Sequence, residues 1–215
     1  MGLYDLDGRI YNALVFVFTL GSEERFTKAA ISTLGLKGGD RVLDWGCGTG
    51  LCLKQIQHVL KEGRIYAAEQ SSSMARHAVA RARPTDKLDY HFIIGDGVQL
   101  SLPEEVDAAV AFYALGTLQP EQFERGVMAL WKNTRPQGRV LVVETHMKPA
   151  TSVYGRVHQA IVRGVLLRLF KDKSSNDLMP TLKRFYKPIE VKFDPGICAI
   201  SFLGERRDVP LPLTA

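Results

Sequence analysis

The sequence has only three cysteines in 215 residues and no C-x-x-C pair. They are Cys47, Cys52 and Cys198. Three cysteines cannot build the disulfide framework of a small secreted domain, so a reducing, cytoplasmic setting is expected. A run of about 20 apolar residues, the length that spans a bilayer, is also lacking, because the longest apolar stretch covers only residues 13–20. Asp5 and Asp7 stand where a secretory signal peptide would carry basic residues.

Signals for a bound metal ion and for a covalent nucleophile are missing as well. The five histidines, at positions 58, 77, 91, 146 and 158, show no metal-ligand spacing. No G-x-S-x-G segment, the nucleophile elbow of α/β-hydrolases, occurs. What is present is a chain of 215 residues that is 46% apolar, which is enough for one globular domain with its own core.

The basic excess is confined to one part of the chain. The 28 Lys and Arg residues against 23 Asp and Glu residues give a formal net charge of +5. Residues 1–144 carry 16 basic and 17 acidic side chains, whereas residues 145–215 carry 12 and 6. This asymmetry predicts two functional zones, of which only the last third is basic.

Short apolar runs alternate with helical patterns through the middle of the chain. This alternation predicts an α/β fold with a mostly parallel sheet and helices on both faces. The expected strands are 41–45, 64–69, 90–94, 106–112 and 139–144. The expected helices are 51–60, 72–83 and 121–134, with another from its N-cap Ser22 to Gly35. Near the end, 189–193 and 197–203 flank Asp194-Pro195-Gly196, a pattern typical of an antiparallel hairpin.

The most informative segment is residues 42–50, Val-Leu-Asp-Trp-Gly-Cys-Gly-Thr-Gly. An apolar strand leads into a loop with glycine at alternate positions, and a helical pattern follows. Glycines let the backbone approach a ligand closely, and a helix N-terminus offers unpaired N–H groups. A dinucleotide fingerprint would need glycine at Leu51, and a P-loop would need Lys-Ser or Lys-Thr after the glycines. Neither condition is met.

The pattern that remains, D-x-G-x-G-x-G from Asp44, resembles the first motif of class I S-adenosylmethionine-dependent methyltransferases. Further similar segments follow in the family's order: Glu69 at a strand end, Ile94-Gly95-Asp96-Gly97, the run 106–118, and the turn 135–139. In that turn Gln137 stands where the family has a glycine. The resemblance covers about residues 40–144. It implies a Rossmann-like fold, S-adenosylmethionine as cofactor and S-adenosylhomocysteine as product.

The same resemblance implies which residues hold the cofactor. They are Tyr11, Asp44, Gly46, Cys47, Gly48, Gly50, Glu69, Gln70, Met74, Asp96, Gly97 and Phe112. Among them, Glu69 is expected to bind the ribose hydroxyls and Asp96 to face the adenine amino group, with Gln70 and Met74 flanking the adenine.

Three residues are candidates for the transfer step itself: Tyr113 after the fourth strand, His146 after the fifth, and Tyr11. The segment around Tyr11 is similar to the Tyr-Asp entrance of ubiquinone/menaquinone-type methyltransferases, with Asn12 in place of Asp. A general base is required only for a protonated or weakly nucleophilic acceptor.

We therefore expect a single methyltransferase domain with four parts. These are an N-terminal helical lid (1–36), a cofactor-binding core (37–144), a basic amphipathic insertion on the substrate side (145–187) and a C-terminal hairpin (188–204). Residues 153–170 combine aliphatic side chains with arginines, which is typical of a helix that lies on an anionic membrane or covers a lipid-sized pocket. The residues expected to meet such a surface are Arg156, Arg163, Arg168 and Lys171.

The acceptor that these features favour is an amphiphilic small molecule, such as a phospholipid amine head group or an isoprenoid quinone ring. The enzyme would then work in the cytoplasm, peripherally at the inner membrane face. DNA is disfavoured, because amino-methylating DNA enzymes carry a D/N-P-P-Y/F motif where Ala111-Phe112-Tyr113-Ala114 stands. RNA, a soluble metabolite or natural product, and a catalytically silent cofactor-binding partner protein are the alternatives.

Overall fold

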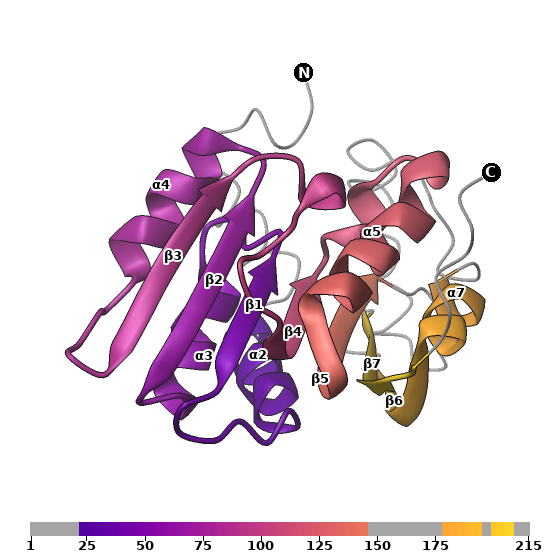
Figure 1. Ribbon diagram of the computed structural model, residues 1–215, viewed down its shortest axis with the longest axis horizontal. Helices are drawn as coiled ribbons and strands as arrows, with labels where there is room; N and C mark the ends of the chain where they lie inside the picture. Colours follow the sequence, from indigo (N-terminus) through magenta and orange to yellow (C-terminus); the bar gives the residue numbers. More distant parts are fainter. Residues whose placement is uncertain (1–21, 146–177, 195–198, 209–215) are drawn as a thin grey trace, which may run out of the picture.

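The computed structural model describes residues 22–145, 178–194 and 199–208, which form a seven-stranded sheet with helices on both faces (Figure 1). The strands are β1 (Arg41–Trp45), β2 (Gly63–Glu69), β3 (Leu88–Ile94), β4 (Val106–Phe112), β5 (Thr134–Thr145), β6 (Tyr186–Asp194) and β7 (Ala199–Arg206). The α-helices are α2 (Glu23–Ser32), α3 (Leu51–Val59), α4 (Ser72–Arg81), α5 (Pro120–Asn133) and α7 (Leu178–Phe185). Two short 3₁₀ turns are η2 (Gly97–Gln99) and η3 (Leu115–Thr117).

The sheet has the strand order β3-β2-β1-β4-β5-β7-β6. Strands β1 to β5 pair in parallel, whereas β7 pairs antiparallel with both β5 and β6. The predicted fold, a mostly parallel sheet that ends in an antiparallel hairpin, is confirmed. The direction of winding reverses between β1 and β4, and ligands of open α/β sheets bind at the carboxyl ends of the strands beside such a switch point.

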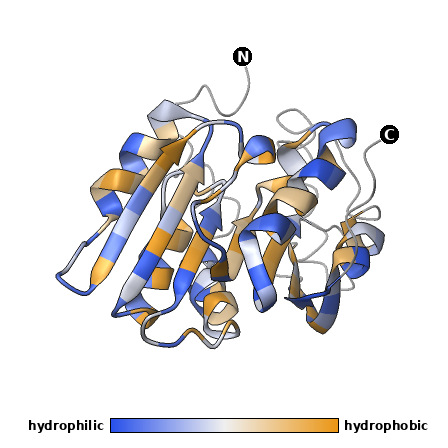
Figure 2. Ribbon diagram, in the orientation of Figure 1, coloured by the Kyte–Doolittle hydropathy of each residue, from blue (hydrophilic) through white to orange (hydrophobic). Residues whose placement is uncertain are grey.

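Successive strand residues point to opposite faces of the sheet and build two cores. Val42 belongs to the core beneath α2, α3 and α4, whereas its neighbour Leu43 belongs to the core beneath α5 and α7. Both side chains are fully buried, and burying one such side chain contributes roughly 1.5–3 kcal/mol. Figure 2 shows apolar stretches along the strands and alternating colours along the helices, as expected when one helix face covers the sheet.

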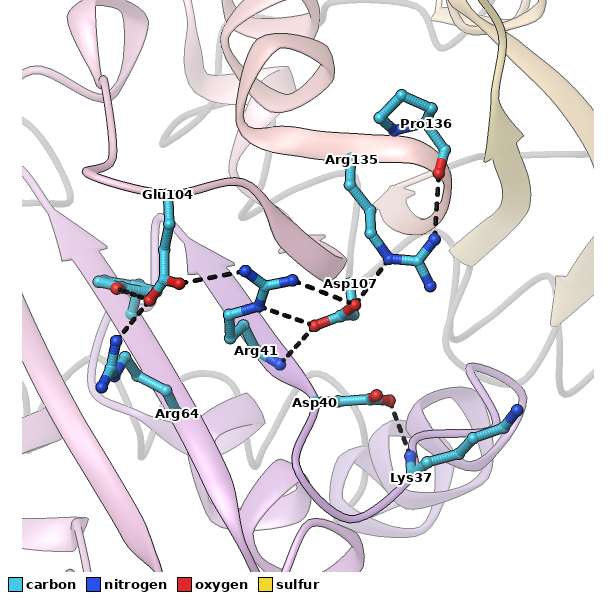
Figure 3. Close-up of polar contacts among 9 residues, drawn as sticks. Lys37, Asp40, Arg41, Arg64, Glu104, Asp107, Arg135 and Pro136 are labelled. Atoms are coloured by element: carbon cyan, nitrogen blue, oxygen red, sulfur yellow. Dashed lines mark hydrogen bonds and ion pairs between the residues drawn. The ribbon is translucent and has the colours of Figure 1, made fainter.

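A network of charged side chains joins the amino ends of the parallel strands (Figure 3). Asp107 accepts hydrogen bonds from the backbone N–H of Arg41 (2.9 Å), from Nε of Arg41 (3.0 Å) and from Nε of Arg135 (2.6 Å). Glu104 forms salt bridges with Arg41 (3.1 Å) and with Arg64. These residues sit at the starts of β1, β2, β4 and β5, or just before them, so they fasten the end of the sheet opposite the switch-point crevice.

Several boundaries differ from the sequence expectations. Strand β5 begins at Thr134 rather than 139, because the turn residues join it, and Gln137 there adopts φ +63°, the left-handed conformation that glycine favours. The hairpin is longer than expected, beginning at Tyr186 and ending at Arg206, and α7 lies within the segment expected as an insertion. Ser22 occupies the N-cap position of α2 but makes no capping hydrogen bond through its side chain. Within the described ranges, no helix is long and apolar enough to cross a membrane.

Candidate active site

A cavity of about 820 Å³ opens at the carboxyl ends of β1, β2 and β4, at the switch point of the sheet. Its floor is the glycine-rich loop after β1, and its sides come from the segments after β2, β3 and β4 and from the beginnings of α2 and α5. Its lining includes Glu23, Thr27, Asp44, Trp45, Gly46, Cys47, Gly48, Glu69, Gln70, Ser71, Met74, Asp96, Gly97, Phe112, Tyr113, Thr117, Leu118, Gln119 and Gln122. Cavities of this volume are at the upper end of the range for small-molecule sites.

The loop after β1 is held in a shape that only glycine adopts easily. Gly46, Gly48 and Gly50 have φ values of +70°, +54° and +81°. The backbone N–H groups of Gly46 and Cys47 both donate to the carbonyl of Ala68 on β2, at 2.9 and 3.0 Å. The loop is thereby fastened to the neighbouring strand, and its residues 46–49 line the cavity.

Asp44 is a buried carboxylate without a hydrogen-bond partner in the part of the chain that the structure describes. Its side chain is on β1, just before the glycine loop, and the residue is 1% exposed. Neither carboxylate oxygen has a hydrogen-bond partner among the described residues. Burial, together with the nearby charge of Glu69, raises the pKa of Asp44 to about 7. A buried charge in this position calls for a cationic or hydrogen-bond-donating ligand.

Glu69, at the end of β2, is oriented by two backbone donors. Its Oε2 accepts a hydrogen bond from the N–H of Gly48 at 2.8 Å, and its Oε1 accepts one from the N–H of Ser71 at 2.8 Å. A carboxylate has about four acceptor positions. Two fixed donors therefore leave each oxygen with capacity for a ligand hydroxyl.

Asp96 lies on the exposed rim, in the segment after β3. Its Oδ1 accepts a hydrogen bond from the backbone N–H of Val98 at 3.0 Å, which caps η2, and its Oδ2 accepts one from Nε2 of Gln99 at 3.1 Å. The indole N–H of Trp45 donates to the carbonyl of Gly97 at 2.9 Å. The rim is thus tied to the end of β1.

The segment after β4 forms another wall. Phe112 ends the strand, and Tyr113 follows with φ +51°, an uncommon conformation for a residue with a side chain. The backbone N–H of Tyr113 donates to the carbonyl of Val143 on β5 at 2.7 Å. This bond holds the chain as it turns into η3, and Thr117 and Leu118 then line the cavity.

Among the described residues, every charged side chain that lines the cavity is acidic. The lining includes the carboxylates of Glu23, Asp44, Glu69 and Asp96, and no Lys, Arg or His. Burial raises the pKa of Glu23 to about 7, although Arg81 acts in the opposite direction. Arginine clusters instead at the opposite end of the sheet, in the network around Asp107.

Known proteins resemble this chain in sequence and in architecture. The methyltransferase-domain family matches residues 42–138. A demethylmenaquinone methyltransferase from Corynebacterium glutamicum (strain R) is 27% identical over 176 residues, which cover 81% of this chain and 71% of the relative. One from Mycolicibacterium paratuberculosis is 28% identical over 176 residues, with the same coverage. The crystal structure of magnesium protoporphyrin IX methyltransferase from Synechocystis PCC 6803 with bound SAH has a TM-score of 0.65 at 14% identity, over 86% of this chain and 84% of that one.

These matches support an S-adenosylmethionine-dependent methyltransferase with the class I fold. The sequence resemblance is thereby confirmed, and S-adenosylmethionine is the cofactor.

The methyltransferase brings most of the predicted site residues to this one cavity. Those that line it are Asp44, Gly46, Cys47, Gly48, Glu69, Gln70, Met74, Asp96, Gly97, Phe112 and Tyr113. Gly50 is not among the cavity-lining residues; it lies against α4, where a Cβ would come within 2.8 Å of the Cα of Ala78, and its role in cofactor binding stays a prediction. Tyr11 and His146 fall outside the described residues, as do Arg156, Arg163, Arg168 and Lys171.

Other residues of the methyltransferase cavity were not predicted. Glu23 and Thr27 reach it from α2, and Gln119 and Gln122 reach it from the beginning of α5. Glu23 and Thr27 are four residues apart, so they share one helix face, and this spacing of polar residues was a usable signal. The glutamines gave no comparable signal, because nothing in their local sequence shows which way the N-terminus of α5 points.

Proposed function

We propose that the cavity binds S-adenosylmethionine between the glycine loop, Asp44, Glu69 and Asp96, and transfers its methyl group to a quinone-like acceptor. The observation that carries the cofactor assignment is the charge of the described lining, which has four carboxylates and no basic side chain. S-adenosylmethionine carries a sulfonium cation and an ammonium group. A nicotinamide dinucleotide carries a pyrophosphate, which this lining would repel.

Asp44 supports the cofactor assignment most directly. Its two carboxylate oxygens are buried and have no partner among the described residues. We infer that Asp44 faces the positively charged methionine end of the cofactor, which would stabilise the ionised carboxylate. The first N–H groups of α3, which begins directly after the glycine loop, can bind the methionine carboxylate.

Glu69 and Asp96 suit the adenosine end. The two backbone donors fix the carboxylate of Glu69 while leaving it able to accept hydrogen bonds from the two ribose hydroxyls. Asp96 is held at the rim by Val98 and Gln99 and can accept a hydrogen bond from the adenine amino group. Met74 and Gln70, which also line this side, are proposed to cover the adenine ring.

When bound, S-adenosylmethionine supplies a sulfonium methyl group that is already activated for nucleophilic attack. The protein therefore has to orient the acceptor and exclude water, and orientation alone can supply roughly 7–11 kcal/mol of a barrier. We propose that Phe112 and Tyr113 position the acceptor at the end of β4. The phenol of Tyr113 can also hydrogen-bond an oxygen of the acceptor or take part in removing its proton.

The proposed acceptor is an isoprenoid quinone ring in its reduced form or a similar amphiphilic molecule. The names of the two demethylmenaquinone methyltransferases support this class, although their identity to this chain is only 27% and 28%. The wall after β4 supports it too, because it combines Phe112, Tyr113 and Leu118 with the amides of Gln119 and Gln122. Apolar side chains suit a ring, and amides can hydrogen-bond its oxygens.

Isothermal titration calorimetry tests the cofactor site. We expect S-adenosylmethionine and S-adenosylhomocysteine to bind and NADH not to bind. Glu69→Ala and Asp44→Ala should each weaken binding at least 10-fold, whereas Asp89→Ala, an exposed carboxylate at the amino end of β3, should not. Wild-type affinity in both site variants would overturn the assignment, and tight NADH binding without S-adenosylhomocysteine binding would overturn the site as a whole.

Methyl-labelled cofactor identifies the acceptor class. The enzyme is incubated with reduced demethylmenaquinone, with phosphatidylethanolamine vesicles, with RNA and with the small-molecule fraction of a cell extract. We expect label in the quinone. Label only in RNA or in soluble metabolites would refute the lipid-like acceptor, and binding of cofactor without transfer to any fraction would favour the silent partner protein.

We also propose that the basic segment meets an anionic membrane surface. The support is its sequence alone, in which Arg156 and Arg163 lie on an apolar background. Each basic residue near an anionic surface contributes roughly 1 kcal/mol. Cosedimentation with anionic vesicles should therefore decrease with salt and in the Arg156→Glu/Arg163→Glu variant. Equal binding to neutral and anionic vesicles, or no binding, would contradict the proposal.

A further inference from the structure

Glu144 is a buried carboxylate at the carboxyl end of β5 that the proposed function does not use. The residue is 7% exposed, and it does not line the cavity. In the sheet it pairs with Ile200 of β7. A carboxylate is costly to bury without compensation, so its contacts show why it is there.

The compensation comes from the segment after β4. Oε1 of Glu144 accepts a hydrogen bond from the backbone N–H of Gly116 at 2.9 Å. The backbone N–H groups of Leu115 and Ala114 also stabilise the charged form, although burial raises the pKa of Glu144 to about 7. Successive backbone N–H groups that converge in this way form an anion-binding concavity. Here the anion is supplied by the protein itself.

Gly116 is the point of closest approach. A Cβ at this position would lie 2.6 Å from Oε2 of Glu144, closer than van der Waals contact permits. Its φ is not in the left-handed region, so the requirement for glycine comes from the proximity of the carboxylate. Only glycine at position 116 therefore allows the turn to lie this close to the carboxylate of Glu144.

The turn that Glu144 holds is part of the cavity wall. Tyr113 and Ala114 line the cavity just before the contact, and Thr117 and Leu118 line it just after. The backbone N–H of Tyr113, at the start of this wall, donates to the carbonyl of Val143 on β5 at 2.7 Å. Releasing Glu144 therefore leaves Tyr113 anchored but removes the tie between β5 and the turn beyond it.

We propose that Glu144 is a positioning residue for methyl transfer, which fixes the η3 turn and thereby the acceptor-side wall of the cavity. The inference rests on the proposed function, since it takes this wall to face the acceptor. Glu144 acts through the backbone of residues 114–116 and touches neither cofactor nor acceptor. Its loss should therefore affect use of the acceptor and leave cofactor affinity unchanged.

A double-mutant cycle tests the contact. Glu144→Ala and Gly116→Ala should each lower kcat/KM for reduced demethylmenaquinone at least 10-fold, mainly through KM of the acceptor. The double variant should be no worse than either single variant, because both changes break one contact. Calorimetry with S-adenosylhomocysteine should give dissociation constants within 2-fold of wild type in all three. Glu121→Gln, an exposed carboxylate in the first turn of α5, is the control for loss of charge.

Hydrogen exchange of the amides of residues 114–118, measured with S-adenosylhomocysteine bound, gives a second readout that needs no acceptor. Glu144→Gln keeps the side-chain shape, and we expect these amides to lose protection at least 10-fold while the core strands stay protected. Unchanged hydrogen exchange of these amides would overturn the positioning role. A double variant whose loss of kcat/KM equals the product of the two single losses would overturn it as well. Loss of cofactor affinity in proportion to turnover would also overturn it. Wild-type cofactor affinity in Glu69→Ala and Asp44→Ala, by contrast, would overturn the proposed function and not this contact.

Discussion

Replacing Asp44 with asparagine should stabilise the cofactor-free protein and weaken cofactor binding at the same time. Burial and the charge of Glu69 raise the pKa of Asp44 from 3.8 to about 7 in the folded state. The folded protein therefore holds this proton more tightly than the unfolded chain does. The contribution of Asp44 to stability is then greatest below pH 4, falls as the pH rises from about 4 to about 7, and stays low above pH 7. Asparagine is neutral at every pH and removes this loss.

The size of the effect follows from the shift. The shift is about 3 pKa units, and each unit corresponds to about 1.4 kcal/mol, so the ionised carboxylate costs roughly 4 kcal/mol at pH 8. About two of these three pKa units take effect between pH 5 and pH 8, because the carboxyl of the unfolded chain is already ionised at pH 5 and that of the folded protein ionises near pH 7. The free energy of unfolding of Asp44→Asn, relative to wild type, should therefore rise by about 3 kcal/mol over this interval. Comparing variant with wild type at each pH removes the titration of the other groups.

Urea denaturation at pH 5 and pH 8, without cofactor, measures this difference. Asp89→Asn is the matched control, because Asp89 is exposed on β3, and its effect should not change with pH in this interval. In calorimetry at pH 8, Asp44→Asn should bind S-adenosylmethionine at least 10-fold more weakly than wild type. A stability difference that is the same at both pH values would refute the argument that Asp44 is an unpaired buried carboxylate. Unchanged cofactor affinity would refute its role in the site.

Two glycines of the loop should respond differently to alanine. Both substitutions should lower stability in urea denaturation, because each glycine has a positive φ, but Gly50→Ala should cost about 1–3 kcal/mol more, because its Cβ would also meet Ala78 whereas a Cβ at Gly48 meets nothing within 4 Å. Gly48→Ala should weaken cofactor binding in calorimetry more than Gly50→Ala does, because Gly48 lines the cavity and Gly50 does not; the reverse order would contradict the assignment. Asp107→Asn should be destabilising at neutral pH. Burial raises the pKa of Asp107, but the hydrogen bonds from Arg41 and Arg135 outweigh burial and lower this pKa to about 2. The stability that these hydrogen bonds contribute is present above pH 4 and is lost as the pH falls toward 2. The substitution should therefore cost about 2 kcal/mol at pH 7 and less at pH 3. A cost independent of pH would argue against the ion pairs.

Most of the fold was predictable because its signals are local. Strand β4 has the predicted bounds, since its apolar run is bounded by polar residues on one side and a turn on the other. Helix α7 was not predicted. It has only eight residues and a proline, Pro180, within it, so its stability depends on Leu182 and Phe185 packing beside α5 rather than on local propensity.

The binding site was predictable where a motif carries it. Asp44, Glu69 and Asp96 each follow or end a strand, and parallel strands bring their carboxyl ends to one edge of the sheet. The sequence could not show that Gly50 packs on α4, because close packing on a helix and close approach to a ligand require the same residue type.

The sequence by itself determined the fold class and the cofactor, because these depend on periodicity and on closely spaced motif residues. Only the tertiary structure decided the roles of the buried charges. Asp44 and Glu144 are both acidic residues in apolar strands; the glycine motif marks Asp44 as a site residue, but nothing local shows which of the two carboxylates has hydrogen-bond partners. Asp44, beside the cavity, has no hydrogen-bond partner among the described residues, whereas Glu144 accepts a hydrogen bond from the turn at Gly116, which lies 28 positions away in the chain. Electrostatic environment depends on distances in space, which strand order sets and sequence spacing does not.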